Sequence, residues 1–318
     1  MLTQDKPDFR YDARCPRGVG LWNLFFPAIR HDGDYESKGA VGKLLIERSG
    51  RQAITISAGH GWSCLVTAPF DLSLYDETVL IALTYLAGLK SASENSNDGS
   101  AEVYTGDYTT TFRRIHEATC SKDHFRPGFT AKRITASLAR LESVMITLYK
   151  DTGNQSELRK DFPEHCFIKS KVVGEDVRVI LSEYLTAALQ KRGEFGGWFL
   201  LSLGERAVLG KNEKAKIGHR FLSVHCLRPA AGHTSKGQFI PLLDFVAAVN
   251  GGKEKLEKMS HKTLLNRVYE ARKLVKDLHE SLKGFGWTIG LQGRSRRHGE
   301  ISDRVYVERR EEKKKKLL

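Results

Sequence analysis

Apolar residues recur at helical spacing near the C-terminus of the chain. Successive members of the set are four and three residues apart in turn: Leu264, Val268, Ala271, Val275, Leu278 and Leu282. This spacing places them on one face of a helix. Gly284 and Gly286 follow the last of them, as glycines commonly follow the C-terminus of a helix. The pattern predicts a long amphipathic helix that begins at Ser260, with basic and polar residues on its other faces.

Two apolar stretches separated by a basic loop follow this helix. Residues 287–291 and 301–307 favour strands, and glycines bound the loop at residues 293–299. The loop carries three arginines: Arg294, Arg296 and Arg297. Helix, strand, basic loop and strand is the order of parts in a winged helix, whose helix enters the DNA major groove while the loop reaches the flanking backbone. The plainer interpretation is a solvated helix followed by an ordinary hairpin.

The same order of parts occurs in the first half of the chain. A buried helix is predicted at residues 79–89, after a helix start at Ser73. A second amphipathic helix is predicted at residues 130–141. Strands are predicted at residues 144–149 and 166–168, on either side of a turn signal and a long loop. This stretch therefore predicts a first module of the same kind, with its wing between the two strands.

The remaining stretches are shorter. We expect strands at residues 52–56 and 62–68 and amphipathic helices at residues 107–119, 176–191 and 239–249. Together the elements predict an α+β protein of two tandem winged-helix domains. The predicted division is a poorly ordered N-terminal arm at 1–20, a first domain at 21–172, a second domain at 173–310 and a charged tail at 311–318.

The charge of the chain narrows the choice of partner. The 318 residues carry a formal net charge of +13, which points to nucleic acid first and to an anionic membrane surface second. The longest apolar run, residues 79–89, is too short to span a bilayer, and the N-terminus lacks an apolar signal segment. We therefore expect a cytoplasmic protein that binds DNA, with no membrane partner.

The cysteines and histidines predict no metal site. The five cysteines lie far apart: Cys15, Cys64, Cys120, Cys166 and Cys226. An odd number without paired spacing argues against a disulfide framework, and no pair has the spacing of a zinc knuckle. Loose pairings such as Cys120 with His124 are better explained by a buried thiol and a surface histidine.

Enzyme signatures are absent from the sequence. There is no glycine-rich phosphate loop that ends in Gly-Lys-Ser or Gly-Lys-Thr. The glycines from Gly284 to Gly290 miss the dinucleotide-binding pattern because the last falls one position late. No histidine pair flanks a single residue, as the metal site of a rolling-circle nickase would require. We predict a protein that is not an enzyme and needs no cofactor.

The chain resembles plasmid replication initiators of the iteron-binding type, which include TrfA-like proteins and related Rep proteins with two winged-helix domains. The resemblance rests on an N-terminal hairpin leading into residues 71–76 and the buried helix, on residues 129–141, and on the final helix with its basic wing. It implies sequence-specific binding to repeated sites (iterons) at a plasmid origin and opening of the adjacent duplex. It further implies recruitment of the host initiator DnaA and the replicative helicase, and a possible homodimer formed through the first domain.

The candidate DNA contacts lie on the two predicted reader helices and the second wing. Arginine and lysine suit guanine edges, asparagine suits adenine, and serine or threonine suits bases or phosphates, whereas wing arginines suit phosphates or the minor groove. The set is Thr130, Lys132, Arg133, Ser137, Arg140, Ser260, Lys262, Asn266, Arg267, Arg294, Arg296 and Arg297. Each residue alone has the plainer interpretation of a solvated surface group.

Two other functions stay open at this point. A winged-helix transcriptional repressor, acting on its own operon, also predicts specific DNA binding but need not distort its site or touch replication proteins. A basic structural or RNA-binding protein predicts salt-sensitive binding with little sequence preference.

Overall fold

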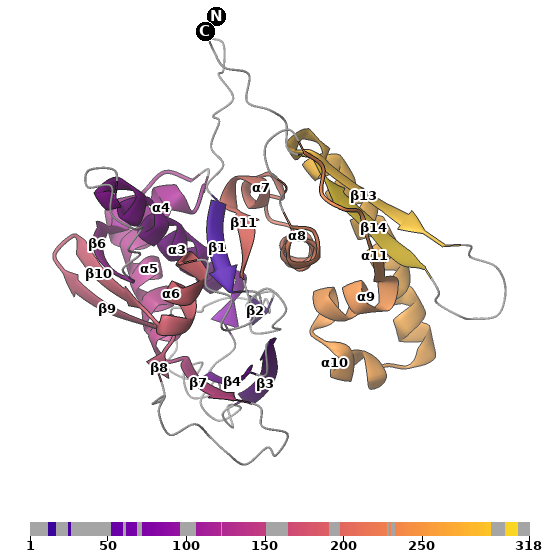
Figure 1. Ribbon diagram of the computed structural model, residues 1–318, viewed down its shortest axis with the longest axis horizontal. Coiled ribbons are helices and arrows are strands. Elements are labelled where there is room, and N and C mark those ends of the chain that lie inside the picture. Colours follow the sequence, from indigo (N-terminus) through magenta and orange to yellow (C-terminus); the bar gives the residue numbers. More distant parts are fainter. Residues whose placement is uncertain are drawn as a thin grey trace, which may run out of the picture.

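The computed structural model shows an α+β protein made of helices and small antiparallel sheets (Figure 1). This confirms the α+β part of the predicted fold class. The structure describes residues 12–16, 25–26, 52–59, 62–68, 72–95, 106–121, 123–150, 165–190, 198–227, 229, 233–293 and 303–310.

The first group of elements, here called module 1, consists of three helices and a three-stranded sheet. In chain order it comprises α3 (Leu74–Asn95), β6 (Asp107–Thr111), α4 (Phe112–Ala118), α5 (Pro127–Glu142), β9 (Ile168–Val173) and β10 (Asp176–Leu181). The sheet is antiparallel with the order β6-β10-β9. Both α4 and α5 pack against α3, so that the three helices enclose one apolar core with the sheet.

Module 2 repeats this arrangement in the C-terminal part of the chain. It comprises α8 (Glu213–His225), β12 (Gln238–Pro241), α9 (Leu242–Asn250), the short α10 (Lys253–Glu257), α11 (His261–Leu282), a 3-10 turn (Lys283–Phe285), β13 (Trp287–Gln292) and β14 (Arg304–Arg309). Its sheet is antiparallel with the order β12-β14-β13. Apart from the additional short α10 and the 3-10 turn in module 2, both modules run helix, strand, helix, helix, strand, strand, with the last strand in the centre of the sheet.

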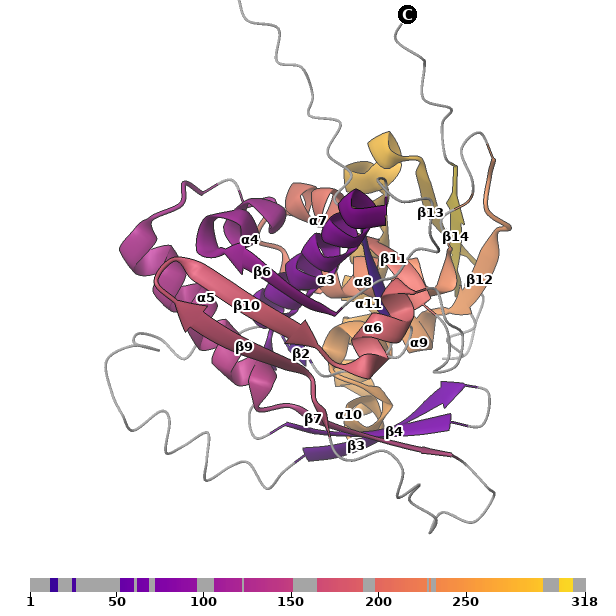
Figure 2. The ribbon, with the colours of Figure 1, turned by 60° about the vertical axis from the view of Figure 1, so that its left-hand side comes forward.

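The remaining elements join the modules or flank module 1. Figure 1 shows β1 and β11 with α7 between the two modules. Strand β1 (Asp12–Pro16) pairs antiparallel with β11 (Trp198–Ser202), which leads into α7 (Leu203–Val208). A four-stranded sheet lies beside module 1 (Figure 2). It contains β3 (Gln52–Gly59), β4 (Trp62–Ala68), β7 (Met145–Lys150) and β8 (His165–Cys166), while β2 (Phe25–Phe26) pairs in parallel with β5 (Leu72–Ser73).

The strongly periodic elements match their predictions. The predicted helix from Ser260 is α11, and the glycine stop is confirmed because Gly286 follows the helix with a left-handed φ of +83°. The buried helix at 79–89 lies within α3. Its start is confirmed by a reciprocal cap, in which the Ser73 N–H donates to Asp76 Oδ2 over 2.8 Å and the Asp76 N–H donates to Ser73 Oγ over 3.2 Å.

The predicted first wing is wrong. The predicted strand at 144–149 does pair with the returning strand, since β7 pairs antiparallel with β8 at Met145–Cys166. Both strands belong to the flanking sheet with β3 and β4, however, and not to the sheet of module 1. The hairpin of module 1's own sheet is β9–β10, which turns at Gly174 with a φ of +63°. Residues 176–191 were expected to be one helix, but 176–181 form β10 and only α6 (Glu183–Leu189) is helical. Alternate residues of β10 are buried, so a period of two decides this stretch.

The N-terminal part and the domain boundary also differ from expectation. Residues 12–16 were assigned to a poorly ordered arm, yet they form β1, whose Ala13 and Cys15 are buried. The boundary expected between residues 172 and 173 falls within the β9–β10 hairpin, so β10 belongs to module 1. Similarly, residues 107–111 form β6 ahead of α4, and residues 238–241 form β12 ahead of α9.

Candidate nucleic-acid interface

Helices α5 and α11 occupy the same place in the two modules and share three buried positions. Their N-cap residues are Arg126 and Ser260. The residues eight, eleven and fifteen positions after each N-cap are buried in both helices: Ile134 with Val268, Ser137 with Ala271, and Leu141 with Val275. The two helices therefore present corresponding residues on their exposed sides.

The exposed side of each helix is here called its reader face. On α5 it consists of Phe129, Lys132, Arg133, Thr135, Ala136 and Ala139. The corresponding residues of α11 are Thr263, Asn266, Arg267, Tyr269, Glu270 and Lys273, and Lys262 lies beside them. Among the residues predicted to contact DNA, Lys132 of α5 thus corresponds to Asn266 of α11, and Arg133 corresponds to Arg267. Phe129 and Tyr269 were not predicted from the sequence as reader-face residues, although they are 57% and 72% exposed. Their exposure could have been predicted from the helical period, once the first residue of each helix was known.

Three predicted contacts on α5 do not lie on its reader face: Thr130, Ser137 and, as described below, Arg140. Thr130 is buried, and its Oγ1 accepts a hydrogen bond from the Arg126 N–H over 3.0 Å. Ser137 is fully buried in the core. The helix begins one turn earlier than predicted because Pro127 is favoured in a first turn. Thr130 therefore supports the start of the helix, and Ser137 packs inward.

Arg140 and Arg133 are both held by the first turn of α3. The Arg140 guanidinium makes a bidentate ion pair with the buried Asp76, with Nη2 2.8 Å from Oδ1 and Nε 3.1 Å from Oδ2. The Arg133 guanidinium stacks on the Tyr75 ring, 3.8 Å from its centroid. Arg140 therefore fixes α5 on α3, whereas Arg133 stays exposed in a fixed orientation.

The first turns of α11 present polar groups to solvent. Ser260 caps the helix, its Oγ accepting the Thr263 N–H over 3.3 Å. Lys262 and Asn266 are exposed. The Arg267 Nη1 lies 2.9 Å from Glu270 Oε2, which the Lys214 Nζ of α8 also approaches to 2.9 Å. On α11, Lys262 and Asn266 thus have the exposure that base reading requires, whereas Arg267 is already paired with Glu270.

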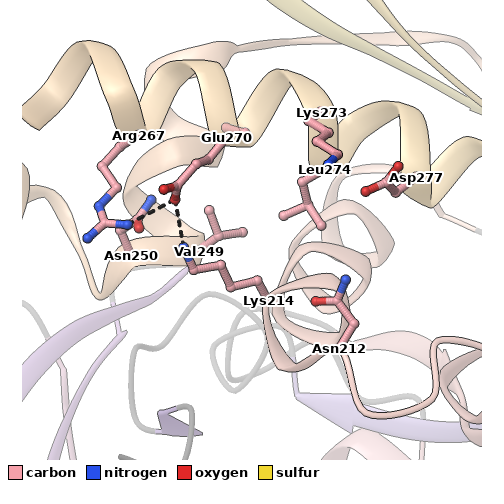
Figure 3. Close-up of a pocket in the computed structure, with 10 residues that line it drawn as sticks. Asn212, Lys214, Val249, Asn250, Arg267, Glu270, Lys273, Leu274 and Asp277 are labelled. Atoms are coloured by element: carbon pink, nitrogen blue, oxygen red, sulfur yellow. Dashed lines mark hydrogen bonds and ion pairs between the residues drawn. The ribbon is translucent and has the colours of Figure 1, made fainter.

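A pocket lies beside the Arg267–Glu270 ion pair, where α11 meets α8 and α9. Figure 3 shows Arg267 and Lys214 converging on Glu270 from two helices. Hydrogen bonding from Lys214, with the neighbouring Arg267, holds the pKa of Glu270 below its ordinary value. The lining also includes Asn212, Val249, Asn250, Lys273, Leu274 and Asp277. Because Glu270 pairs with both Lys214 and Arg267, this ion-pair cluster connects α11 to α8.

The loop expected as the second wing lies outside the described residues, and with it Arg294, Arg296 and Arg297. Its base is described. Strands β13 and β14 pair as far as Gln292 and Arg304. The Arg272 Nη2 on α11 lies 2.5 Å from Asp303 Oδ2 at the start of β14. Because Arg272 belongs to the same helix as the reader face, this ion pair fixes the origin of the loop relative to α11.

A buried charge network, here called the junction, connects the two modules through α7. The Glu77 carboxylate of α3 receives the Arg206 Nη2 of α7 at 3.0 Å and the Arg220 Nη1 of α8 at 3.1 Å. All three side chains are at most 3% exposed. Burial alone would raise the pKa of Glu77, but the two guanidinium groups outweigh it and hold the pKa below its ordinary value.

The neighbouring Glu205 of α7 binds module 2. Its Oε2 receives the His219 Nε2 at 2.9 Å and the Trp287 Nε1 at 3.1 Å, and its Oε1 pairs with Arg309 of β14. Burial would raise the pKa of Glu205, but His219 and Arg309 hold it below its ordinary value. Burial also lowers the pKa of His219 despite the Glu205 carboxylate, so the imidazole is neutral and donates from Nε2. Adjacent residues of α7 thus bind both modules.

The junction predicts a loss of stability in acid. A folded-state pKa below the unfolded value means that the unfolded chain binds more protons as the pH falls. We expect the free energy of unfolding to decrease below about pH 6.5, because His219 is protonated more readily in the unfolded chain, and again below about pH 4.5 for Glu77 and Glu205. Urea unfolding from pH 8 to pH 4 measures this. The His219→Gln variant keeps a donor for Glu205, and it should show a smaller loss between pH 7 and pH 5 than the wild type; equal losses would contradict this origin.

The metal-ligating side chains and thiols of the described residues are dispersed. No group of three metal-ligating side chains occurs among them, and Cys15, Cys120, Cys166 and Cys226 are free thiols. Burial raises the pKa of the Cys15 and Cys120 thiols to about 12, so neither is a nucleophile at neutral pH. None of the described helices has the length and apolar character needed to cross a membrane.

Comparisons with known proteins show the fold. No family model matches the chain, and no curated protein sequence matches it. A crystal structure of domains 2 and 3 of RctB aligns with a TM-score of 0.50 at 12% sequence identity, covering 92% of this chain and 98% of that chain. Another RctB domain 2–3 structure aligns with a TM-score of 0.43 at 12% identity, covering 92% and 96%. The first alignment shows that this chain has the fold of a two-domain RctB fragment.

Proposed function

We propose that this protein is a sequence-specific DNA-binding replication initiator, and that its modules are two winged-helix domains. The observation that carries the proposal is the repeated arrangement of the modules. Apart from the short α10 and the 3-10 turn of module 2, the two modules share one order of helices and strands and one sheet order. Each places one helix, α5 or α11, in the same register with basic residues on its exposed side. In winged helices this is the helix that enters the major groove.

The fold comparison supports a replication-initiator role in general. RctB is a replication initiator, and nearly the whole of its two-domain fragment aligns with this chain. The formal charge of +13 supports a nucleic-acid partner. On the sequence resemblance, we extend the proposal to a cytoplasmic plasmid initiator that binds repeated origin sites, opens the adjacent duplex and recruits DnaA and the replicative helicase. The proposal requires no enzymatic activity, since initiators of this kind act by binding.

A transformation test examines the proposal. The gene with its flanking DNA is placed on a circle that lacks any other origin. One version carries Lys262→Ala with Asn266→Ala, and another carries Arg294→Ala, Arg296→Ala and Arg297→Ala. Autonomous maintenance by the wild type, and its loss in both variants, is the expected result. Maintenance that survives both sets of substitutions would exclude these residues as the origin contacts.

The repressor alternative predicts a different result. A protein that only occupies its operator would give no maintenance in a suitable host, yet it would bind tightly upstream of its own gene. A footprint on the flanking DNA separates the two functions, because an initiator also makes neighbouring base pairs reactive to single-strand probes. Tight binding without maintenance or strand opening would replace the initiator proposal with the repressor.

A further inference from the structure

The reader face of α5 is rich in methyl groups. Apart from Lys132 and Arg133, the exposed residues are Phe129, Thr135, Ala136 and Ala139. Phe129 lies in the first turn of the helix and is 57% exposed. An aromatic ring exposed to water forgoes the favourable free energy of burying its apolar surface. Isolated exposed apolar residues are ordinary on protein surfaces, but here they share one face with two cations.

Thr135 adds to this face as a methyl group. Its Oγ1 donates a hydrogen bond to the Ala131 carbonyl oxygen over 2.9 Å, within the same helix. The hydroxyl proton is therefore occupied by the backbone, which leaves the side-chain methyl as the distinctive group presented outward. Ala136 and Ala139 lie one and four positions further along and are also exposed.

The matching positions of α11 carry different chemistry. Thr135 corresponds to Tyr269, Ala136 to Glu270 and Ala139 to Lys273. Polar or charged groups therefore occupy the positions at which α5 carries methyl groups. Because the two helices share one register, the difference lies in what each face recognises, and the modules are not duplicate readers of one half-site.

Charge around the α5 reader face suits a polyanion. Lys132 and Arg133 lie on the face itself, and Lys169 and Lys171 are exposed on β9, which packs against α5. No acidic residue belongs to the face, and the charge of Asp76 is matched by Arg140. The cations could contact the phosphates at the edges of a duplex groove, while the apolar residues beside them face the base edges on its floor.

We propose that α5 reads thymine, through contact between its methyl-bearing face and the 5-methyl groups of thymines in the major groove. Thymine carries the only apolar group that the four bases present on the major-groove floor, and alanine, threonine methyl and phenylalanine are the side chains that contact it. The half-site of module 1 is then thymine-containing, whereas Asn266 directs module 2 toward adenine. This inference rests on the proposed function and names the bases that its first module recognises.

Replacing thymine with deoxyuridine tests the proposal, because only the 5-methyl group is removed. Duplexes that the full chain enriches from random DNA are synthesised with thymine or with uracil, and affinities are measured by fluorescence anisotropy. We expect wild-type affinity to fall about four-fold for each contacted methyl, the factor that corresponds to about 0.8 kcal/mol per buried carbon group. The Phe129→Ser, Ala136→Ser double variant should bind both duplexes alike. The Asn266→Ala variant, the matched control in module 2, should bind more weakly but keep the wild-type uracil penalty.

Each outcome decides the inference. Specific wild-type binding without a uracil penalty would overturn thymine reading and leave the proposed function intact. A penalty that persists unchanged in the Phe129→Ser, Ala136→Ser variant would also overturn it, by assigning the methyl contacts to another element. If random DNA yields no enriched sequence, the proposed function fails, and this inference fails with it. Both substituted side chains are exposed, and an unchanged circular dichroism spectrum verifies the fold.

Discussion

The Glu77→Gln variant is expected to lose about 3–5 kcal/mol of its free energy of unfolding. The introduced glutamine would fill the same volume as the glutamate, so the loss reports charge and not a cavity. Arg206 and Arg220 would stay buried without the carboxylate that both of them approach. The cost of leaving a buried charge uncompensated exceeds the cost of losing an exposed pair. Equilibrium unfolding in urea, followed by circular dichroism, measures the change.

The control for this prediction is Glu280→Gln. This substitution also removes a carboxylate charge that pairs with a cation, Lys283, but both side chains are largely exposed at the C-terminal end of α11. Its stability should stay close to that of the wild type. If the Glu77 and Glu280 variants unfold at the same urea concentration, the junction does not stabilise the protein in the way its burial indicates.

The Lys262→Ala, Asn266→Ala variant is expected to bind its specific duplex at least about thirty-fold more weakly, without loss of stability. A well-formed contact between a side chain and a base edge contributes about 1–3 kcal/mol of discrimination, and Lys262 adds its charge. Both side chains are exposed near the start of α11, so their removal leaves the core unchanged. Anisotropy titration at fixed salt measures the affinity, and urea unfolding verifies the stability.

The matched control changes the same charge further along the same helix. In the Lys276→Ala, Ser281→Ala variant, both altered residues are exposed but lie beyond the reader face. A small, sequence-independent loss of affinity is expected, as for one phosphate contact or none. Equal losses in the two variants would mean that α11 attracts DNA by net charge and does not read bases.

Through the junction, the short helix α7 connects the two modules. Glu205 and Arg206 are neighbours in the sequence, yet one binds β13 and β14 of module 2 while the other binds α3 of module 1. A substitution that removes the Glu77 carboxylate therefore also affects α7, because α7 carries both Arg206, the partner of Glu77, and Glu205. We infer that α7 fixes the orientation of one module relative to the other, and with it the relation between the two reader helices.

Local pattern was sufficient for the elements with a strong period. The stripe from Leu264 to Leu282 predicted α11 correctly, and the Ser73–Asp76 cap predicted the start of α3. The first wing was missed because residues 176–181 carry apolar spacing compatible with a helix as well as with a strand. Pairing with β6, far away in the sequence, selects the strand, and no local signal encodes that partner.

The sequence could predict the candidate site only as far as the helical period shows which side of a helix faces solvent. Lys132, Arg133, Lys262 and Asn266 lie on the reader faces or beside them, and their role in DNA binding stays a prediction. Thr130 and Ser137 face inward on the helix surface that packs into module 1. Arg140 is paired with Asp76, which lies 64 residues earlier. The junction left no signal in the sequence beyond charged residues within apolar stretches, because its partners meet only in the folded chain.

The measurement that tests the central claim most directly compares specific with nonspecific DNA binding by the full chain. Duplexes enriched from random DNA are titrated beside shuffled duplexes of the same composition, at two salt concentrations. We predict that the enriched duplex binds about a thousand-fold or more tightly than the shuffled one, and that the Lys262→Ala, Asn266→Ala variant loses most of this ratio. Equal affinity for both duplexes, falling steeply with salt, would contradict the account and show a basic protein that binds polyanions without reading sequence.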